Sequence, residues 1–362
     1  MNILAIDTSC DETAVAITHN TEIVSNIVWS QAALHSSFGG VMPSLAQRQH
    51  QERIDFVVDK ALKVSKTSID NIDAIAVTIG NGLGIALGVG INTAKELAIK
   101  YNKPLIPVSH TEAHLLSSFA NSKSQIPNYK QILNSNLKFP MFGMVLSGGT
   151  TVLCLIKAIG EYEILAETSD DAIGEALDKG ARLLGLGYPG GAILEKFAKN
   201  GDPKKYQLPL PLHQDKIKNR FSYSGLKTAF VRLFNEIKDP NKQDIADLAA
   251  SFQSVAFDHI EKVLEYQFNN LAIKQCKNLL FGGGVANNVE IKKRLRKLCK
   301  KHVVSLRVPY TKKLNGDNAG MIGVCAYLKN KNLNTKKLND KYGGIKNIEL
   351  IDRNPRLKLS TS

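Results

Sequence analysis

Hydrophobic and polar positions alternate in short blocks along this chain, and the blocks predict strands that are followed by helices. An apolar run over residues 3–6 ends at Asp7, a polar turn follows, and a second apolar run over 13–17 completes a strand–turn–strand hairpin. The same design returns over residues 142–156, with a Ser-Gly-Gly-Thr turn at 147–150. One hairpin that occurs twice predicts two lobes of related build.

Further apolar runs and helical periods continue this alternation. Residues 54, 57, 58, 61 and 62 keep helical spacing and predict an amphipathic helix over 44–64. Strands are expected over 73–79, 105–108, 278–281 and 303–308, and further helices over 87–101, 171–184, 191–199 and 244–270. Strands that alternate with helices predict an α/β fold with a mainly parallel or mixed sheet in each lobe.

These elements divide the chain into two lobes and a tail. We expect an N-terminal lobe over residues 1–137 and a C-terminal lobe over 138–330, whose last helix packs back toward the first lobe. The polar residues 121–138 are expected to connect the lobes at the surface. Residues 331–362 are basic and polar without a clear period, so we expect a poorly packed tail.

Composition narrows the class of protein. The chain has 362 residues, of which 43% are hydrophobic, enough for two lobes with real cores. The sequence enters its first strand at once, with no basic leader and no long apolar segment, so a cytoplasmic protein is expected. The five cysteines include no Cys-x-x-Cys pair and are expected to be reduced thiols, with Cys10 packed as a small residue.

The net charge of +14 is large enough to favour association with a polyanion. Seven of the basic residues lie on one expected helix, and six more follow near the C-terminus. Such runs are also typical of a solvated helix face, and charge alone does not decide between the two interpretations. The residues concerned are Lys292, Lys293, Arg294, Arg296, Lys297, Lys300, Lys301, Lys329, Lys331, Lys336, Lys337, Lys341 and Lys346.

A pair of histidines one helical turn apart is the clearest candidate for chemistry. His110 and His114 follow a short apolar strand, and positions i and i+4 share one face of a helix, so both imidazoles can bind one metal ion. In metalloproteases of the His-Glu-x-x-His type, the general base follows the first histidine directly. Glu112 lies two residues on, about 200° around the helix, and is expected to point away from the imidazoles. A metalloprotease is therefore disfavoured.

Two glycine-rich turns are candidates for anion binding. The turn at 147–150 lets backbone N–H groups approach an anion, and the three glycines at 282–284 open a helix whose first N–H groups are free. Each feature alone is also typical of an ordinary tight turn. Two hairpins across a cleft, with such a turn on the second lobe, resemble the nucleotide-binding arrangement of the two-lobed actin/Hsp70/sugar-kinase-like superfamily, in which Asp7 or Asp11 would manage metal and phosphate.

A narrower resemblance covers residues 2–328. The chain resembles the tRNA N6-adenosine threonylcarbamoyltransferase family, which includes the bacterial TsaD proteins and their archaeal and mitochondrial relatives. The matching motifs are IDTSCDET (6–13), GGVMPSLAQRQH (39–50), HTEAH (110–114), SGG (147–149), DDAIGEALDK (170–179), YPGG (188–191), FSYSGLK (221–227), GGVANN (283–288) and GDNA (316–319).

The resemblance implies a metal centre and a substrate site. It implies that Asp317 joins His110 and His114 as a third ligand for one iron or zinc ion, which leaves coordination positions open. It places threonylcarbamoyl-AMP, and with it an adenine nucleotide, against eight residues, with Glu195 as a weaker candidate. These eight are Val145, Leu146, Ser147, Gly148, Gly149, Asp178, Gly191 and Asn288.

The implied reaction is an acyl transfer to tRNA. The threonylcarbamoyl group would pass from its mixed anhydride with AMP to the exocyclic N6 amine of the adenosine beside the anticodon, at position 37. We expect Asp11 and Glu12 to handle the proton or to position metal and phosphate. The expected partners are the tRNA anticodon arm, a TsaB-like paralogue bound through the N-terminal lobe and a small TsaE-like ATPase.

Three departures from the family pattern and two alternatives remain. Thr150 stands where the family has a histidine, Asn81 where it has proline, and Asn287 where it has alanine. A kinase or ATPase of the same superfamily would not need the histidine pair. A non-catalytic scaffold, such as the shorter paralogue that partners this family, lacks that pair.

Overall fold

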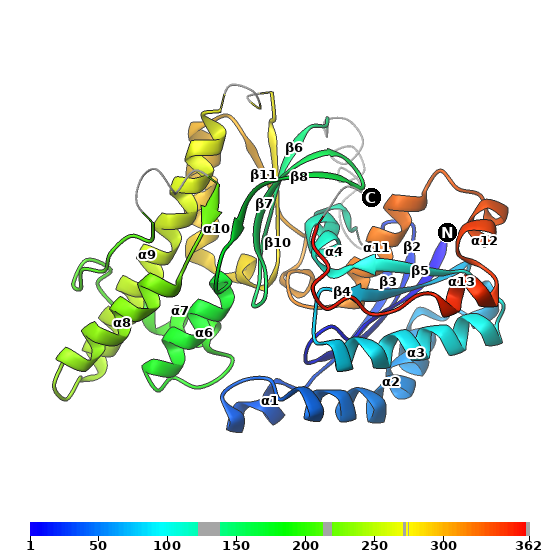
Figure 1. Cartoon of the computed structure of the whole chain (residues 1–362), viewed down its shortest axis with the longest axis horizontal. Helices are drawn as coiled ribbons and strands as arrows, with labels where there is room; N and C mark the ends of the chain where they lie inside the picture. The colour runs from blue at the N-terminus through cyan, green and yellow to red at the C-terminus, as the bar shows by residue number, and fades with distance from the viewer. Residues whose placement is uncertain (122–137, 213–218, 271–272, 274, 360–362) are drawn as a thin grey trace.

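The computed structural model describes residues 1–121, 138–212, 219–270, 273 and 275–359, which form two lobes that each contain one mixed sheet (Figure 1). The first sheet has the order β3-β2-β1-β4-β5, with β1 antiparallel to β2 and parallel to β4. Its strands are β1 (Asn2–Asp7), β2 (Glu12–His19), β3 (Glu22–Ser30), β4 (Ala74–Gly80) and β5 (Leu105–Ser109).

Side chains on the two faces of this sheet enter two different cores. Leu4 and Ile6 of β1 pack with α2 (Pro43–Ser65) and α3 (Gly84–Lys100), whereas Ile3 and Ala5 face α4 (His110–Leu116) and α11 (Ala319–Asn330). Because successive strand residues point to opposite faces, an apolar run without alternation is what this doubly covered sheet requires.

Helix α11 joins the first lobe although it follows the second in the sequence. Its contacts are with β1, β2, β3 and α4. Small residues permit this close packing, since a Cβ at Gly323 would lie 2.6 Å from the Thr18 hydroxyl oxygen. The contact brings the turn before α11, which carries Asp317, to the edge of the cleft.

The second sheet repeats the first. Its order is β11-β10-β6-β7-β8-β9, so an antiparallel β6-β7-β8 meander is flanked by the parallel strands β10 and β11, as β1-β2-β3 is by β4 and β5. The duplicated mixed sheet predicted from the two hairpins is confirmed. The strands are β6 (Met141–Leu146), β7 (Thr151–Ala158), β8 (Glu161–Thr168), β9 (Arg220–Phe221), β10 (Asn278–Gly282) and β11 (Ser305–Arg307).

Five α-helices among the described residues complete the second lobe. They pack with Phe142, Met144 and Leu153 of the sheet in one continuous apolar core. These helices are α6 (Ile173–Leu183), α7 (Gly190–Ala198), α8 (Ser224–Glu236), α9 (Lys242–Phe268) and α10 (Val289–Lys301). A short α1 (Ala32–His35) precedes α2 in the first lobe. No helix in the described part of the chain combines the length and the apolar character needed to cross a bilayer.

The expectation of a poorly packed tail after residue 331 is wrong. That part of the chain forms α12 (Thr335–Tyr342) and α13 (Ile345–Glu349) and then returns along the first lobe (Figure 1, red). Leu338, Ile348 and Leu359 are buried. These three anchors are too far apart in the sequence to produce a periodic pattern, so the segment looked unstructured. The expected connection at 121–138 falls almost entirely on residues 122–137, which lie outside the described residues.

Candidate metal centre and substrate cleft

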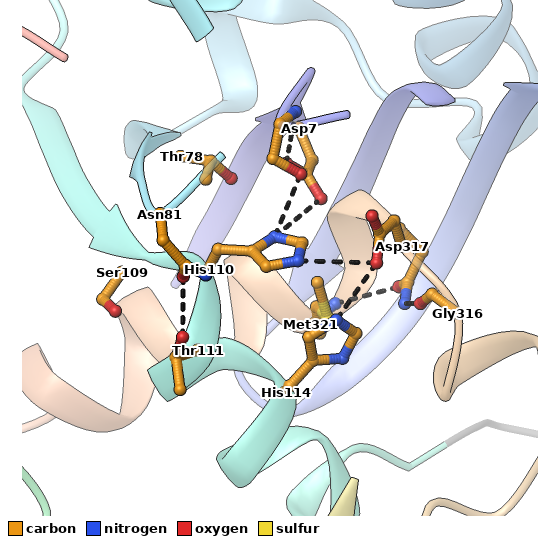
Figure 2. Close-up of polar contacts among 12 residues, drawn as sticks. Asp7, Thr78, Asn81, Ser109, His110, Thr111, His114, Gly316, Asp317 and Met321 are labelled. Carbon is orange, nitrogen blue, oxygen red and sulfur yellow. Dashed lines mark hydrogen bonds and ion pairs between the residues drawn. The ribbon is translucent and has the colours of Figure 1, made fainter. Parts of the chain in front are cut away.

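The two histidines project from the first turn and a half of α4. Ser109 ends β5 and caps the helix, because its hydroxyl oxygen accepts the Glu112 backbone N–H at 3.4 Å. His110 is therefore the first helical residue, and His114 lies one turn later on the same face, with 4.6 Å between the ring centroids (Figure 2). Both side chains are buried.

Asp317 reaches the pair from the turn before α11. The next residue, Asn318, caps α11 by accepting the Met321 N–H at 3.1 Å, which fixes the turn. One carboxylate oxygen of Asp317 lies 3.1 Å from His114 Nε2 and 3.4 Å from His110 Nε2 (Figure 2). The structure thus brings Asp317 to the histidine pair, although it lies 203 positions beyond His114 in the sequence. The candidate ligand atoms of the three residues all lie within 4.8 Å of one another.

Electrostatics keep Asp317 ionised. Burial alone would raise its pKa, but the adjacent imidazoles of His110 and His114 hold that pKa well below its usual range. Burial lowers the pKa of both imidazoles; for His110 the carboxylates of Asp317 and Asp7 reverse the sign and raise it, whereas the pKa of His114 stays lowered. A buried carboxylate beside two imidazoles is a donor set that suits a transition-metal ion, which would compete with the proton on His110.

Asp7 orients the first histidine from behind. It ends β1, is 1% exposed, and its carboxylate lies 3.5 Å from His110 Nδ1, where the Ser9 hydroxyl also lies at 3.1 Å (Figure 2). A carboxylate on one ring nitrogen fixes the tautomer and leaves the other nitrogen, Nε2, directed at Asp317. The superfamily resemblance implied that Asp7 or Asp11 manages metal and phosphate, and the structure places Asp7 beside His110, a candidate metal ligand.

Glu112 points away from the imidazoles, as the helical geometry predicted. Its carboxylate accepts the Tyr162 hydroxyl at 2.8 Å and pairs with Lys329 of α11 at 2.7 Å. Because both oxygens bond to groups behind α4, Glu112 supplies no general base at the metal centre. This removes the basis for a metalloprotease.

A cleft of about 700 Å³ opens beside the metal centre. It is lined by His110, Asp317, the 147–150 turn and parts of α6, and this volume suits a nucleotide-sized ligand. A Cβ at Gly148 or Gly149 would meet nothing within 4 Å, so both backbone positions face open space. The Ser147 hydroxyl accepts the Thr150 N–H at 3.1 Å and keeps the turn tight.

Helix α6 supports this turn and contributes one wall of the cleft. The Gly174 N–H donates to the Ser147 carbonyl at 3.1 Å, and a Cβ at Gly174 would lie 2.8 Å from Gly148 Cα. Further along α6, Asp178 lines the cleft and accepts the Gly191 N–H at 2.7 Å. Burial raises the pKa of Asp178, although hydrogen bonds from the backbone N–H groups of Gly191 and Gly190 act in the opposite direction. Gly191 itself is not among the described residues that line the cleft.

Other candidate substrate residues are used within the fold. The side chains of Val145 and Leu146 are fully buried in β6. Asn288 caps α10 by accepting the Glu290 N–H at 2.9 Å, and its amide donates to Gln253 at 2.8 Å. Glu195 accepts the Val289 N–H at the same helix start. None of the four is among the described residues that line the cleft, so their contact with substrate stays a prediction.

Asp11 and Glu12 follow Ser9 and Cys10, which line the cleft, but neither carboxylate is among the described residues that line it. Burial raises the pKa of Glu12, and Asp317 and Asp11 raise it further. Glu12 also accepts the Ser30 hydroxyl at 3.1 Å. Their role in proton transfer stays a prediction. Burial likewise raises the pKa of the Cys10 thiol, so this cysteine is a neutral packing residue, and all five cysteines are unpaired.

Two departures from the family pattern contact each other across the lobes. The Asn81 amide donates to the Thr150 hydroxyl at 3.0 Å, and the Thr111 hydroxyl donates to the Asn81 carbonyl oxygen at 2.6 Å (Figure 2 shows the second contact). The first lobe is thereby joined by a hydrogen bond to the 147–150 turn of the second lobe. This link was invisible in the sequence, where the two substitutions look independent.

Comparisons with known proteins agree with the geometry. The family model described as TsaD, tRNA N6-adenosine threonylcarbamoyltransferase, matches residues 22–324. The protein of that name from Caldicellulosiruptor saccharolyticus is 40% identical, and the match covers 91% of this chain and 93% of the relative. The protein of that name from Trichlorobacter lovleyi is 42% identical, and the match covers 91% of this chain and 92% of the relative. The Clostridium kluyveri protein of the same name is 40% identical over 98% of this chain and 99% of its own.

Solved structures agree on the fold. HypF of T. kodakarensis superimposes with a TM-score of 0.56 at 17% identity, and covers 93% of this chain and 49% of the HypF chain. At this identity the likeness concerns the fold alone. Together with the duplicated mixed sheets, it confirms the predicted two-lobed actin/Hsp70/sugar-kinase-like architecture.

Proposed function

Because the chain belongs to the tRNA N6-adenosine threonylcarbamoyltransferase family, whose members transfer a threonylcarbamoyl group to an adenosine of tRNA, we propose that its interlobe cleft is the site of this reaction. The chain is an acyltransferase of tRNA modification. The observation that carries the proposal is that His110, His114 and Asp317 lie together beside a cleft that also contains the exposed glycines of the 147–150 turn. We place this chemistry in the cytoplasm.

The donor in this proposal is threonylcarbamoyl-AMP. Its phosphate would lie against Gly148 and Gly149, where the backbone is unobstructed, and its ribose would approach Asp178 on α6. This orientation directs the acyl group toward His110 and Asp317. Asp11 and Glu12 come directly after Ser9 and Cys10 of the cleft lining, and the Asp317 carboxylate raises the pKa of Glu12, which supports a place for this pair near the acyl group.

His110, His114 and Asp317 would hold one iron or zinc ion. Two imidazoles and one carboxylate fit such an ion, and Asp7 behind His110 is the orienting carboxylate that such sites use. Lewis acidity toward a substrate oxygen is the chemistry that a bound ion supplies there. The protein contributes the fixed orientation of the three ligands and their exclusion from bulk water.

The transfer forms one bond and breaks another. The N6 nitrogen of adenosine attacks the carbamoyl carbon, the bond from that carbon to the phosphate oxygen breaks, and AMP leaves. The nitrogen must lose one proton, and the Asp11 and Glu12 pair is our candidate acceptor because the raised pKa of Glu12 makes its carboxylate a stronger base. The backbone N–H groups of Gly148 and Gly149 would stabilise the departing phosphate, since the Ser147 N–H donates to the Thr150 carbonyl.

Partners are part of the proposal. On α10, Lys293, Arg296 and Lys297 are exposed and available to tRNA phosphates, whereas Arg294 is occupied by Asp258, Glu261 and Glu290 inside the fold. A TsaB-like paralogue fits the first lobe, which exposes large apolar side chains near α1 and α2. These are Leu34, Phe38, Met42 and Phe56, each more than 40% exposed. A TsaE-like ATPase remains an expectation from the family.

Mass spectrometry of tRNA nucleosides tests the function. Purified protein, its paralogue and ATPase partners, threonylcarbamoyl-AMP and unmodified tRNA should yield threonylcarbamoyladenosine. A matched reaction with Asp317→Asn should yield at most a small fraction of it. Absence of product from the wild-type protein, with a related enzyme active under the same conditions, would contradict the proposal.

A further inference from the structure

Residues 353–359 form one rim of the cleft, although they lie beyond the part of the chain in which the sequence indicated a site. Pro355, Arg356, Leu357, Lys358 and Leu359 all line the cleft, on the side opposite Asp178 and α6. Arg356 is exposed, whereas Leu359 is buried. The rim therefore carries the exposed cation of Arg356 on the same cleft that His110 and Asp317 line.

Backbone hydrogen bonds to the first lobe hold the chain just before Arg356, and a surface ion pair links Lys358, two residues later, to the second lobe. Toward the first lobe, the Asn354 N–H donates to the Ile79 carbonyl at 2.6 Å and the Gly82 N–H donates to the Pro355 carbonyl at 3.2 Å. Toward the second lobe, Lys358 pairs with Glu167 of β8 at 2.9 Å. The segment is therefore pre-organised for binding, which lowers the entropic cost of a contact through Arg356.

Two glycines at the start of α3 make room for this segment. A Cβ at Gly84 would lie 3.0 Å from Pro355 Cγ, and a Cβ at Gly88 would lie 3.0 Å from the Arg353 guanidinium. Arg353 in turn donates to the Gly84 carbonyl at 3.2 Å. The absence of side chains at Gly84 and Gly88 therefore lets Pro355 and Arg353 pack closely against α3 beside the cleft.

A comparison of the cations along the cleft distinguishes Arg356. Lys179 is paired with Asp171 and Glu175 at 2.8 Å each, and Arg182 donates to the Gly39 carbonyl at 3.4 Å. Lys358 is paired with Glu167, as described above. Among the lysine and arginine side chains that line the cleft, Arg356 alone has no hydrogen bond or ion pair with another described residue. An unpaired guanidinium on a fixed rim is suited to an external phosphate.

We propose that Arg356 binds a backbone phosphate of the tRNA strand beside the acceptor adenosine and so positions that adenosine at the cleft. The proposal rests on the function proposed above. The acceptor base must enter the cleft to reach the acyl carbon, while the phosphates of its strand stay at the surface, where Arg356 lies. The donor phosphate, by contrast, is assigned to the 147–149 turn of the second lobe, so the exposed cation at Arg356 is left for the tRNA strand.

Binding and kinetic measurements on Arg356→Ala and Arg356→Lys test this proposal with the full chain. For Arg356→Ala we expect about a tenfold weaker Kd for unmodified tRNA by fluorescence anisotropy, with a similar rise in the KM for tRNA. The slope of log Kd against log salt should fall by about one. Arg356→Lys keeps the charge and should lose less. Lys238→Ala, which removes an exposed charge after α8 outside the cleft lining and outside the two basic runs, is the control and should change the Kd less than twofold.

Two results would overturn the proposal. One is an unchanged tRNA Kd and salt slope in Arg356→Ala. The other is a raised KM for threonylcarbamoyl-AMP with an unchanged KM for tRNA, which would assign Arg356 to the donor phosphate. Because the anisotropy measurement needs no turnover, it tests Arg356 even if the wild-type protein forms no product, and that failure would concern the proposed function instead.

Discussion

Loss of the Asp317 carboxylate should release the metal ion while leaving the fold intact. Asp317→Asn keeps the size of the side chain and leaves the neighbouring cap at Asn318 untouched. It replaces the single anionic oxygen that lies within 3.4 Å of both histidine Nε2 atoms by a neutral amide. The substitution therefore isolates the ligand from the turn that carries it.

The magnitude follows from the role of that oxygen. Substitutions of groups that merely orient a metal ligand typically weaken metal binding by about 10-fold to 100-fold. Asp317 would be a direct ligand and the only anionic one, so we expect a loss of at least about 100-fold in affinity, or roughly 2.8 kcal/mol. His114→Ala should behave similarly, since it removes one of the three ligands.

Metal content after dialysis against a competing chelator is the assay, with iron and zinc measured by mass spectrometry. Glu112→Gln is the matched control, because it neutralises a buried carboxylate on the same helix that bonds to Tyr162 and Lys329 instead. We expect about one ion per chain in the wild type and in Glu112→Gln, and close to none in Asp317→Asn. Equal retention of metal by Asp317→Asn and the wild type would refute the assigned ligand set.

Three further predictions concern the surroundings of the site. In a double-mutant cycle on Asn81→Ala and Thr150→Ala, unfolding in urea should give a coupling energy of about 0.5–1.5 kcal/mol, and strict additivity would mean that the interlobe hydrogen bond contributes nothing. Gly174→Ala should destabilise the protein by about 1–3 kcal/mol and raise the KM for the donor, because the new Cβ would displace Gly148. Gly225→Ala is the control: open space surrounds this position, so the substitution should be neutral or mildly stabilising. Equal effects of the two substitutions on the KM for the donor would contradict this prediction. Burial lowers the pKa of His259 from 6.5 to about 4, so its contribution to the free energy of unfolding is fully present above pH 6.5 and should fall by up to about 3 kcal/mol as the pH drops to 4. The variant His259→Gln should flatten this part of the curve of unfolding free energy against pH. An unchanged curve would count against a buried neutral imidazole at this position.

The sequence indicated those features that depend on local periodicity. The runs at 3–6 and 142–146 identified the central strands, and the spacing of His110 and His114 fixed their shared helix face. Asp317 did not follow from spacing, because its position depends on α11 packing against the first sheet through Gly323 and Thr18. Only the resemblance to the family supplied it in advance.

Features that depend on long-range contacts were missed. The resemblance placed Asn288 and Glu195 at the substrate, which stays a prediction, but it did not indicate that both side chains accept free N–H groups at the start of α10. The segment after residue 331 is held by widely spaced anchors and by backbone hydrogen bonds to Ile79 and Gly82, which leave no compositional trace. Its return to the cleft, and with it the place of Arg356, is evident only in the folded chain.

A crystal structure with a stable analogue of threonylcarbamoyl-AMP, combined with anomalous diffraction at the iron and zinc edges, tests the central claim most directly. The account predicts an anomalous peak bonded to His110, His114 and Asp317, with the adenylate phosphate against Gly148 and Gly149. An ion bound elsewhere, or an adenylate outside the interlobe cleft, would contradict it.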